Sequence, residues 1–128
     1  MNLFELRSAL RLATGPDVNL DLELFRHFNP NRNPYTWLHG RPCLFLGFNK
    51  EWRAIEPDPY TAKLDVALML LPDDCWYSIT GPDQAEARFY RRNGDIAVNV
   101  VTATTTPIAI CLARVEYEIA KEANNATA

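Results

Sequence analysis

Hydrophobic residues recur at helical spacing through the first part of the chain. We predict one helix over residues 3–13, capped by Asn2, and a second over residues 17–28. The residues TGPD at 14–17 end the first helix and begin the second, so the two form a helical hairpin. The apolar stripe expected on the first helix is Leu3, Leu6 and Leu10. The stripe expected on the second is Val18, Leu22 and Phe25.

Prolines and polar residues interrupt this pattern over residues 29–58. Two short stretches within it, CLFLGF at 43–48 and EWRAI at 51–55, are aromatic or β-branched and flank Asn49-Lys50, which predicts a small β-hairpin. We interpret the remainder as a loop-rich insertion in a single domain of residues 1–128. A chain of this length buries roughly two-thirds of its unfolded surface.

The stretch TAKLDVALMLL, residues 61–71, predicts a helix that begins at Thr61 and ends before Pro72. Apart from Lys63 and Asp65 it is apolar all round. A helix of this kind must be covered on most sides, so we expect it in the middle of the fold.

Three stretches at meander spacing follow, and Asn93-Gly94 between the last two is a strong hairpin signal. The expected strands are residues 75–80, 85–91 and 95–102. The third strand is apolar on both faces, which predicts that it is covered on both sides.

A final helix is expected from Thr106-Pro107 to about Glu122, with Arg114 among the residues that face water. Its predicted buried stripe is Ile108, Cys111, Leu112, Val115 and Ile119. The element order α-α-(β-β)-α-β-β-β-α predicts an α+β domain in which an antiparallel meander sheet is sandwiched between helical layers.

Composition and charge narrow the functional classes. Hydrophobic residues make up 48% of the chain, which is typical of a globular protein, and the net charge of -3 makes nucleic acid an unfavourable partner. Apolar runs surround all three cysteines, which predicts buried, reduced thiols and a place in the cytoplasm of the cell. Neither an apolar run of 18 residues nor a signal-peptide pattern is present, so we expect no membrane span.

Three segments together resemble a known family. They are ATGPD at 13–17, PYTAKLDVALMLLP at 59–72 followed by Cys75-Trp76, and TATTTPIAICLARVEYEIA at 102–120. The chain is similar here to the phage ABA-sandwich domain, although TTPI at 105–108 replaces the usual Ala-Thr-Pro-Ala and residues 29–58 have no clear counterpart. The resemblance implies a helix-sheet-helix sandwich and a phage or prophage origin in a bacterial host. It implies no activity for particular residues.

Catalytic and metal-binding signatures are weak in the sequence. His27 and His39 lack a second ligand at metal spacing, and the cysteines form no CxxC pair, so we predict no metal, no cofactor and no catalytic residue. Carboxylate pairs occur at Asp73-Asp74 and at Asp21 and Glu23, but a solvated turn after Pro72 explains Asp73-Asp74 better than acid catalysis does.

A threonine-rich entry to the last helix, near a set of arginines, is the best candidate for a ligand site. Free N–H groups at a helix N-terminus favour an anion, so a phosphate would fit there, and aromatic rings would add stacking surfaces for a base. The candidate residues are Arg88, Arg91, Arg92, Thr102, Thr104, Thr105, Thr106, Trp76 and Tyr60. The alternative is that the threonines only form strand and cap, the arginines are solvated, and the aromatics fill the core or an oligomer interface.

These observations lead to one function and two alternatives. We expect a non-enzymatic phage accessory protein that acts by binding, with counter-defence through a sequestered nucleotide signal or a masked host protein. The first alternative is a small phosphodiesterase-like enzyme that uses Asp73, Asp74 and the arginines. The second is a structural protein that self-associates through aromatic residues of the 37–52 region.

Overall fold

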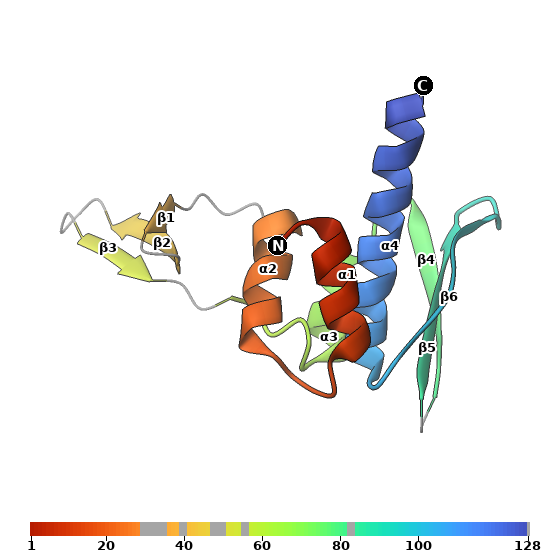
Figure 1. The fold of residues 1–128 in the computed structure, drawn as a ribbon, viewed down its shortest axis with the longest axis horizontal. Helices are drawn as coiled ribbons and strands as arrows, with labels where there is room; N and C mark the ends of the chain where they lie inside the picture. The colour runs from red at the N-terminus through yellow and green to blue at the C-terminus, as the bar shows by residue number, and fades with distance from the viewer. Residues whose placement is uncertain (29–35, 39–40, 47–50, 55–56, 82–83, 128) are drawn as a thin grey trace.

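A computed structural model describes residues 1–28, 36–38, 41–46, 51–54, 57–81 and 84–127 of the chain (Figure 1). Its elements are α1 (Leu3–Leu12), α2 (Val18–Phe28), β1 (Thr36–Leu38), β2 (Arg41–Leu46), β3 (Glu51–Ala54), α3 (Leu64–Ala67), the 3-10 helix η1 (Leu68–Leu70), β4 (Cys75–Thr80), β5 (Ala85–Arg91), β6 (Ile96–Ala103) and α4 (Thr106–Thr127). The described elements confirm the α+β class.

Side-chain caps define the beginnings of the first two helices. Asn2 and Glu5 form a reciprocal capping box on α1, in which the N–H of Glu5 donates to Asn2 over 2.8 Å. Asp17 accepts from the N–H groups of Asn19 and Leu20 at the start of α2. Both predicted helices are therefore confirmed, and so is the stripe that α1 buries.

The stripe predicted for α2 is wrong in part. Val18 is 62% exposed, whereas Asp21 is buried beside three apolar residues of the same helix, which are Leu20, Leu24 and Phe25. A polar partner explains this orientation, because the Asp21 carboxylate accepts two hydrogen bonds from Thr61 in the interior. That contact turns the acidic residue toward the core.

The predicted small hairpin is confirmed as the antiparallel pair β2–β3, in which Cys43 lies opposite Ala54. A further strand, β1, pairs with β2 and was not predicted. The turn at residues 49–50 and most of the connections within 29–58 lie outside the described residues. This small sheet lies to one side of α2, and its buried residue Cys43 takes no part in the main core (Figure 1).

The prediction of a long central helix over residues 61–71 is wrong. Residues 64–67 form a single helical turn, α3, and η1 continues it, while Lys63 is extended with φ -126° and ψ 128°. Thr61 is 1% exposed and does not cap α3. Hydrogen bonds from Thr61 to α2 hold the preceding chain in a turn, and this tertiary contact overrides helix propensity.

The central element is α4. Every residue from Ile108 to Ala113 is buried, because α4 packs against α1 and α3 on one side and against β5 and β6 on the other. The helix therefore carries a fully enclosed segment where a single buried stripe was expected. Beyond this segment its C-terminal turns extend past the body of the protein (Figure 1).

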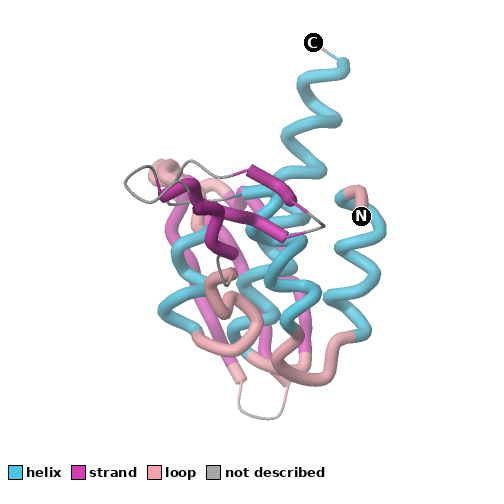
Figure 2. Tube along the Cα trace, turned by 90° about the vertical axis from the view of Figure 1, so that its left-hand side faces the viewer, coloured by secondary structure: helices cyan, strands magenta, loops and turns pink. Residues whose placement is uncertain are grey.

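Strands β4, β5 and β6 form the predicted antiparallel meander, in the order β4-β5-β6. The helices lie on one face of this sheet, as Figure 2 shows from the helical side. The expected coverage of β6 on both sides is wrong, since Ile96 is 53% and Val100 44% exposed. Among the described elements, none forms a second helical layer over the outer face. No helix in the described part of the chain has the length and apolar character to cross a membrane.

Candidate functional site

The outer sheet face, the side of β4–β6 that faces away from α4, carries a row of large side chains. Trp76 on β4 lies opposite Tyr90 on β5, which lies opposite Ile96 on β6. Alternation directs Trp76 and Tyr90 outward, because their neighbours Cys75 and Phe89 are buried. Ile96 shares this face as the partner of Tyr90 and is exposed. We call Trp76, Tyr90 and Ile96 the outer row.

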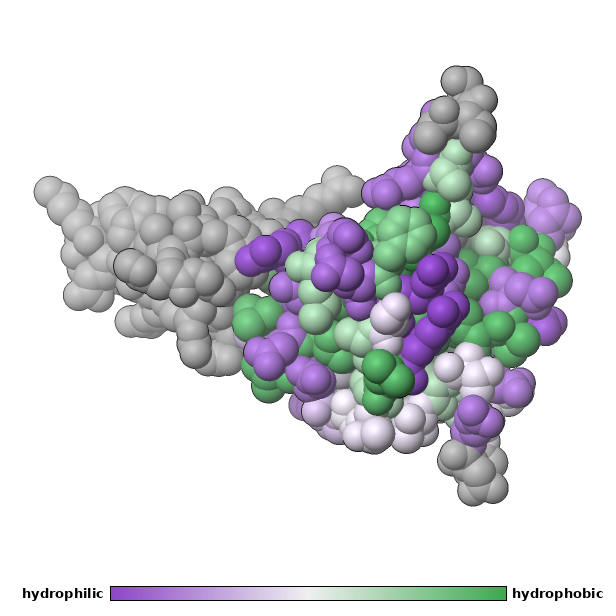
Figure 3. All heavy atoms as spheres, in the orientation of Figure 1, coloured by the Kyte–Doolittle hydropathy of each residue, from purple (hydrophilic) through white to green (hydrophobic). Residues whose placement is uncertain are grey.

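Two of the three residues of the outer row are highly exposed, and Tyr90 between them is partly buried. Trp76 is 66% exposed and Ile96 is 53% exposed. Hydrophobic side chains are visible at the surface on the sheet side of the molecule, mixed with hydrophilic ones (Figure 3). Large apolar side chains gathered on one uncovered face are typical of a binding surface.

Arg88 gives the outer row a positive neighbour. It lies two residues before Tyr90 on β5, opposite Ser78, and its guanidinium donates to the Tyr90 hydroxyl over 3.5 Å. Hydrogen bonds from Arg88 and Ser78 hold the pKa of Tyr90 below its ordinary value of 10.0. An aromatic platform and a cation therefore lie side by side.

The other end of the outer sheet face is acidic and polar. Glu86 lies between Thr80 and Thr102 in the register, and Thr80 donates to its carboxylate over 3.4 Å. Four residues along a strand span about 13 Å, which is the separation of Glu86 from Tyr90. The positive, aromatic part of the face is thus short.

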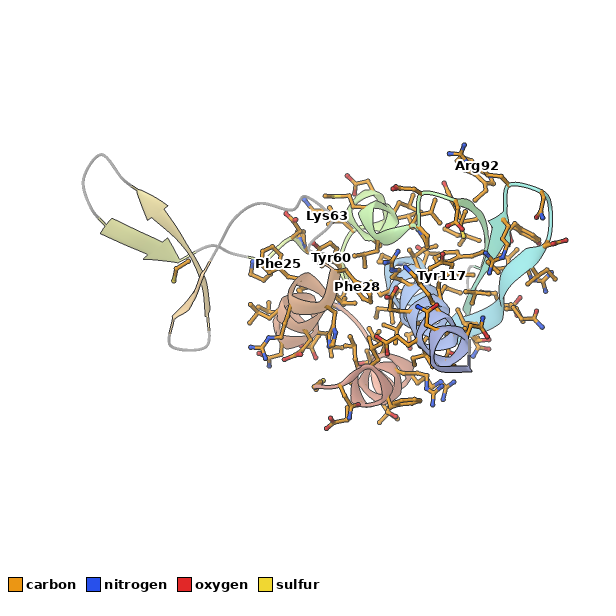
Figure 4. The ribbon with its side chains drawn as sticks, turned by 90° about the horizontal axis from the view of Figure 1, so that it is seen from above. Phe25, Phe28, Tyr60, Lys63, Arg92 and Tyr117 are labelled. Atoms are coloured by element: carbon orange, nitrogen blue, oxygen red, sulfur yellow. The ribbon has the colours of Figure 1, made fainter. Side chains whose placement is uncertain are left out.

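The structure separates the arginines that the sequence analysis grouped. Arg91 forms an ion pair with Asp74 over 3.6 Å, and Arg92 donates to the backbone carbonyl of Asp73 over 3.1 Å. Figure 4 shows Arg92 projecting at the edge of the molecule. These two arginines fasten β5 to the turn before β4, and only Arg88 lies on the outer sheet face.

The threonine cluster is also divided. Thr102 lies on the outer sheet face, Thr104 donates to the carbonyl of Ala13, and Thr106 is the first residue of α4. The hydroxyl of Thr105 accepts from the N–H of Ile108 over 3.4 Å and so caps the helix itself.

The predicted anion site, with threonines and arginines together, is therefore not assembled. In the register of β5 and β6, the start of α4 lies beyond Ala85, whereas Arg91 is at the opposite end of β5. Six residues of a strand span about 20 Å, which is too far for one phosphate to contact both groups.

Tyr60 lies in the interior and offers no stacking surface. It is fully buried, its hydroxyl donates to Asp58 over 3.4 Å, and burial raises the pKa of its phenol. In Figure 4 it points inward near Phe25 and Phe28. The role expected for it in a ligand site is wrong.

The carboxylates of the Asp73-Asp74 turn are poorly arranged for acid catalysis. Asp74 accepts from the Tyr117 hydroxyl over 3.2 Å. Burial works to raise the pKa of Asp74, but hydrogen bonds from Tyr117 and Cys75 and the charge of Arg91 outweigh it, and the pKa lies below its ordinary value. A general acid needs the opposite shift.

The thiols are equally unsuited to nucleophilic chemistry. Cys43, Cys75 and Cys111 are buried and lie outside any disulfide, as predicted. Burial raises the pKa of Cys75 to about 11 and also raises that of Cys111, so both remain protonated at neutral pH. Within the described residues, His, Cys, Asp and Glu side chains form no group of three that would hold a metal ion.

A groove of about 810 Å³ lies between η1 and α4. Its floor is Arg114, which the sequence analysis placed in water. The guanidinium lies 4.8 Å from the centre of the Phe28 ring and donates to the carbonyl of Leu70 over 3.1 Å and to Glu118 over 3.3 Å. Through these contacts Arg114 connects η1 to α4 and is not available to a ligand. We therefore interpret the groove as a feature of helix packing and not as a binding site.

Tyr90 and Ile96 are the functional candidates that sequence reasoning missed. The signal was present in the alternation of β5 and in the Asn93-Gly94 turn, which together place Tyr90 outward near the beginning of β6. Two irregularities in the β5–β6 register between Ala87 and Tyr90 prevent a prediction, from the sequence, of the β6 residue that lies opposite Tyr90.

Comparison with family models, with curated proteins and with solved structures finds no match for the chain. The candidate site is therefore defined by its own geometry.

Proposed function

We propose that the protein acts by binding and that its ligand is a nucleotide held on the outer sheet face. The observation that carries this proposal is the outer row with Arg88 beside it: Trp76 and Tyr90 are directly opposite each other on adjacent strands. Aromatic side chains on an antiparallel sheet bind bases by stacking, and every base has a face suited to it.

Charge favours a small ligand over a long nucleic acid. Arg88 supplies a cation for one phosphate, and Glu86 stands two residues further along the same strand. The net charge of -3 opposes the binding of a polyanion as a whole. We infer that the ligand is a mononucleotide or a small cyclic nucleotide whose base lies on the outer row and whose phosphate faces Arg88.

The wider biological form of the proposal rests on the resemblance to phage ABA-sandwich proteins. A phage accessory protein in the cytoplasm of a bacterial host would protect the phage by sequestering a nucleotide signal. Sequestration requires affinity and no turnover. The lowered pKa of Asp74 and the raised pKa of Cys75 are unfavourable for acid and nucleophilic catalysis, which supports a binding role.

A fluorescence titration tests the proposal directly. A base that stacks on Trp76 changes its emission, so a panel of linear and cyclic nucleotides should include at least one that gives a saturable change. Inorganic phosphate alone serves as the control and should give none. A flat response across the whole panel would overturn the proposal.

A further inference from the structure

Strand β4 is an edge of the main sheet that lacks the usual protection. Among the described strands, the sheet order β4-β5-β6 leaves one side of β4 without a neighbour. The strand, CWYSIT, contains no charge and no proline, and its register with β5 is unbroken from Cys75 to Thr80. Edges that avoid pairing carry lysine, proline, bulges or a covering element.

The opposite edge, β6, shows what such protection looks like. Its register with β5 shifts twice between Ala87 and Tyr90, and the Asn99 side chain accepts from the N–H of Val100 over 2.8 Å. Helix α1 lies against β6, and Thr104 just beyond β6 donates to the carbonyl of Ala13 after α1. The β6 edge thus has features that prevent pairing with another strand, whereas the β4 edge has the regular, uncharged character of an edge that can pair.

Side chains on both faces of β4 are left incompletely covered. Of the described elements, β4 packs extensively only against β5, because α4 lies over β5 and β6. Trp76 is therefore largely exposed and its ring centre lies 5.2 Å from that of Tyr77, while Tyr77 and Ile79 are only partly buried. A strand added beside β4 would cover apolar surface on both sides.

We propose that β4 pairs with β4 of a second copy of this chain, antiparallel, about a two-fold axis at Ser78. A two-fold contact pairs the strand with an identical strand, so a charged residue near the axis would lie close to the same charge of the second copy, and β4 carries no charged residue. Residues that lie opposite each other in an antiparallel pair must point to the same face of the sheet. The two-fold axis can therefore pass through a residue, such as Ser78 or Tyr77, but not between two residues.

The register centred on Ser78 gives the better side-chain pairs. Tyr77 then lies beside Ile79 of the second copy, which is a favourable aromatic and β-branched pair, and Trp76 lies beside Thr80 of the second copy. A register centred on Tyr77 would place two tyrosines opposite each other and leave Thr80 unpaired. The dimer so formed has one continuous six-stranded sheet, and the outer sheet face stays open to a ligand.

Two measurements on the full chain test this inference. Light scattering should show the mass rising from that of one chain, 14.6 kDa, toward twice that value as the concentration increases to about 300 μM, because a short edge contact gives an affinity on the order of micromolar. A mass that stays at one chain throughout would overturn the proposal.

Disulfide crosslinking tests the register. Ser78 and Thr80 are both exposed on the outer face, so Ser78→Cys and Thr80→Cys form a matched pair that leaves the core intact. With oxidised glutathione, Ser78→Cys should form covalent dimer at least about fivefold more than Thr80→Cys, because only position 78 faces itself. Equal crosslinking at the two positions would contradict the two-fold axis at Ser78. Neither measurement contains a nucleotide, so both are independent of the proposed ligand.

Discussion

Thr61 donates its backbone N–H and its hydroxyl to the same carboxylate oxygen of Asp21, each over 2.8 Å, in the interior of the protein. The hydroxyl of Thr61 also accepts from the N–H of Asp17 over 2.8 Å. Next to it, the carbonyl of Tyr60 accepts from the thiol of Cys111 on α4 over 3.4 Å. This polar junction fastens the beginning of α2 to the chain before α3 and, through it, to the central helix.

Replacing Thr61 with valine should destabilise the fold by about 2–3 kcal/mol, because the buried Asp21 carboxylate loses one of its two donors while the shape of the side chain is kept. Urea denaturation measures the loss. The matched control is Thr104→Val, in which an exposed hydroxyl loses its bond to Ala13, at a cost below about 1 kcal/mol. Equal losses for the two variants would contradict the importance of the junction.

Replacing Asp21 with asparagine should change how stability depends on pH. Burial raises the pKa of Asp21 above its ordinary value of 3.8, so the folded state holds the proton more tightly than the unfolded state does. Its contribution is therefore full below pH 3.8 and declines as pH rises through the folded pKa. The free energy of unfolding of the wild type, relative to Asp21→Asn, should fall over that range.

Denaturation of both proteins at a series of pH values from about 2 to 7 measures this difference. Asp74→Asn is a useful counterpart, because the pKa of Asp74 is lowered and its contribution is lost as pH falls through the folded pKa. The two variants should therefore differ from the wild type with opposite pH trends. A difference for Asp21→Asn that rises with pH would show that burial is not the dominant influence.

Local signals in the sequence were enough to predict both N-terminal helices, the β2–β3 hairpin and the meander. Asn2, the TGPD turn and Asn93-Gly94 act within a few residues, so their effects can be inferred without a tertiary structure. The helix over residues 61–71 failed because a contact 40 residues away, between Asp21 and Thr61, decides the local backbone. Long-range hydrogen bonds leave no periodic trace in a sequence.

The candidate site shows the same division. Trp76 and Arg88 were both named as candidates for a ligand site, and both lie on strands of the main sheet. Their grouping with the threonines before α4 was wrong, because adjacency in the sheet depends on register and on which end of a strand each residue occupies. The pairing of Tyr90 with Ile96 emerges only when the two irregularities in the β5–β6 register are known.

Replacing Arg114 with methionine should destabilise the protein by about 1–3 kcal/mol, because its guanidinium stacks on Phe28 and satisfies the carbonyl of Leu70. Thermal denaturation measures the effect. Arg11→Met is the control: Arg11 is exposed and pairs only with Glu116 in the described contacts, so its loss should cost less than about 1 kcal/mol. A larger effect for Arg11 would contradict the structural role assigned to the groove.

Replacing Arg88 with glutamine should weaken nucleotide binding and make it nearly independent of salt. In the wild type, raising the ionic strength from about 0.05 M to about 0.5 M should lower the affinity by screening the phosphate from Arg88. Arg91→Gln removes the same charge from a residue that pairs with Asp74 away from the outer row, so it should keep the salt dependence of the wild type. Identical salt profiles for the two variants would locate the phosphate elsewhere.

Calorimetric titration of Trp76→Ala with the best nucleotide of the panel tests the central claim most directly. Stacking of a base on an aromatic ring contributes about 1–3 kcal/mol, so the affinity should fall roughly fivefold to a hundredfold. Phe4→Ala is the matched control, because Phe4 is also an exposed aromatic residue but lies on α1, away from the outer sheet face. The account predicts a loss for Trp76→Ala and wild-type affinity for Phe4→Ala. Unchanged affinity in Trp76→Ala would contradict it.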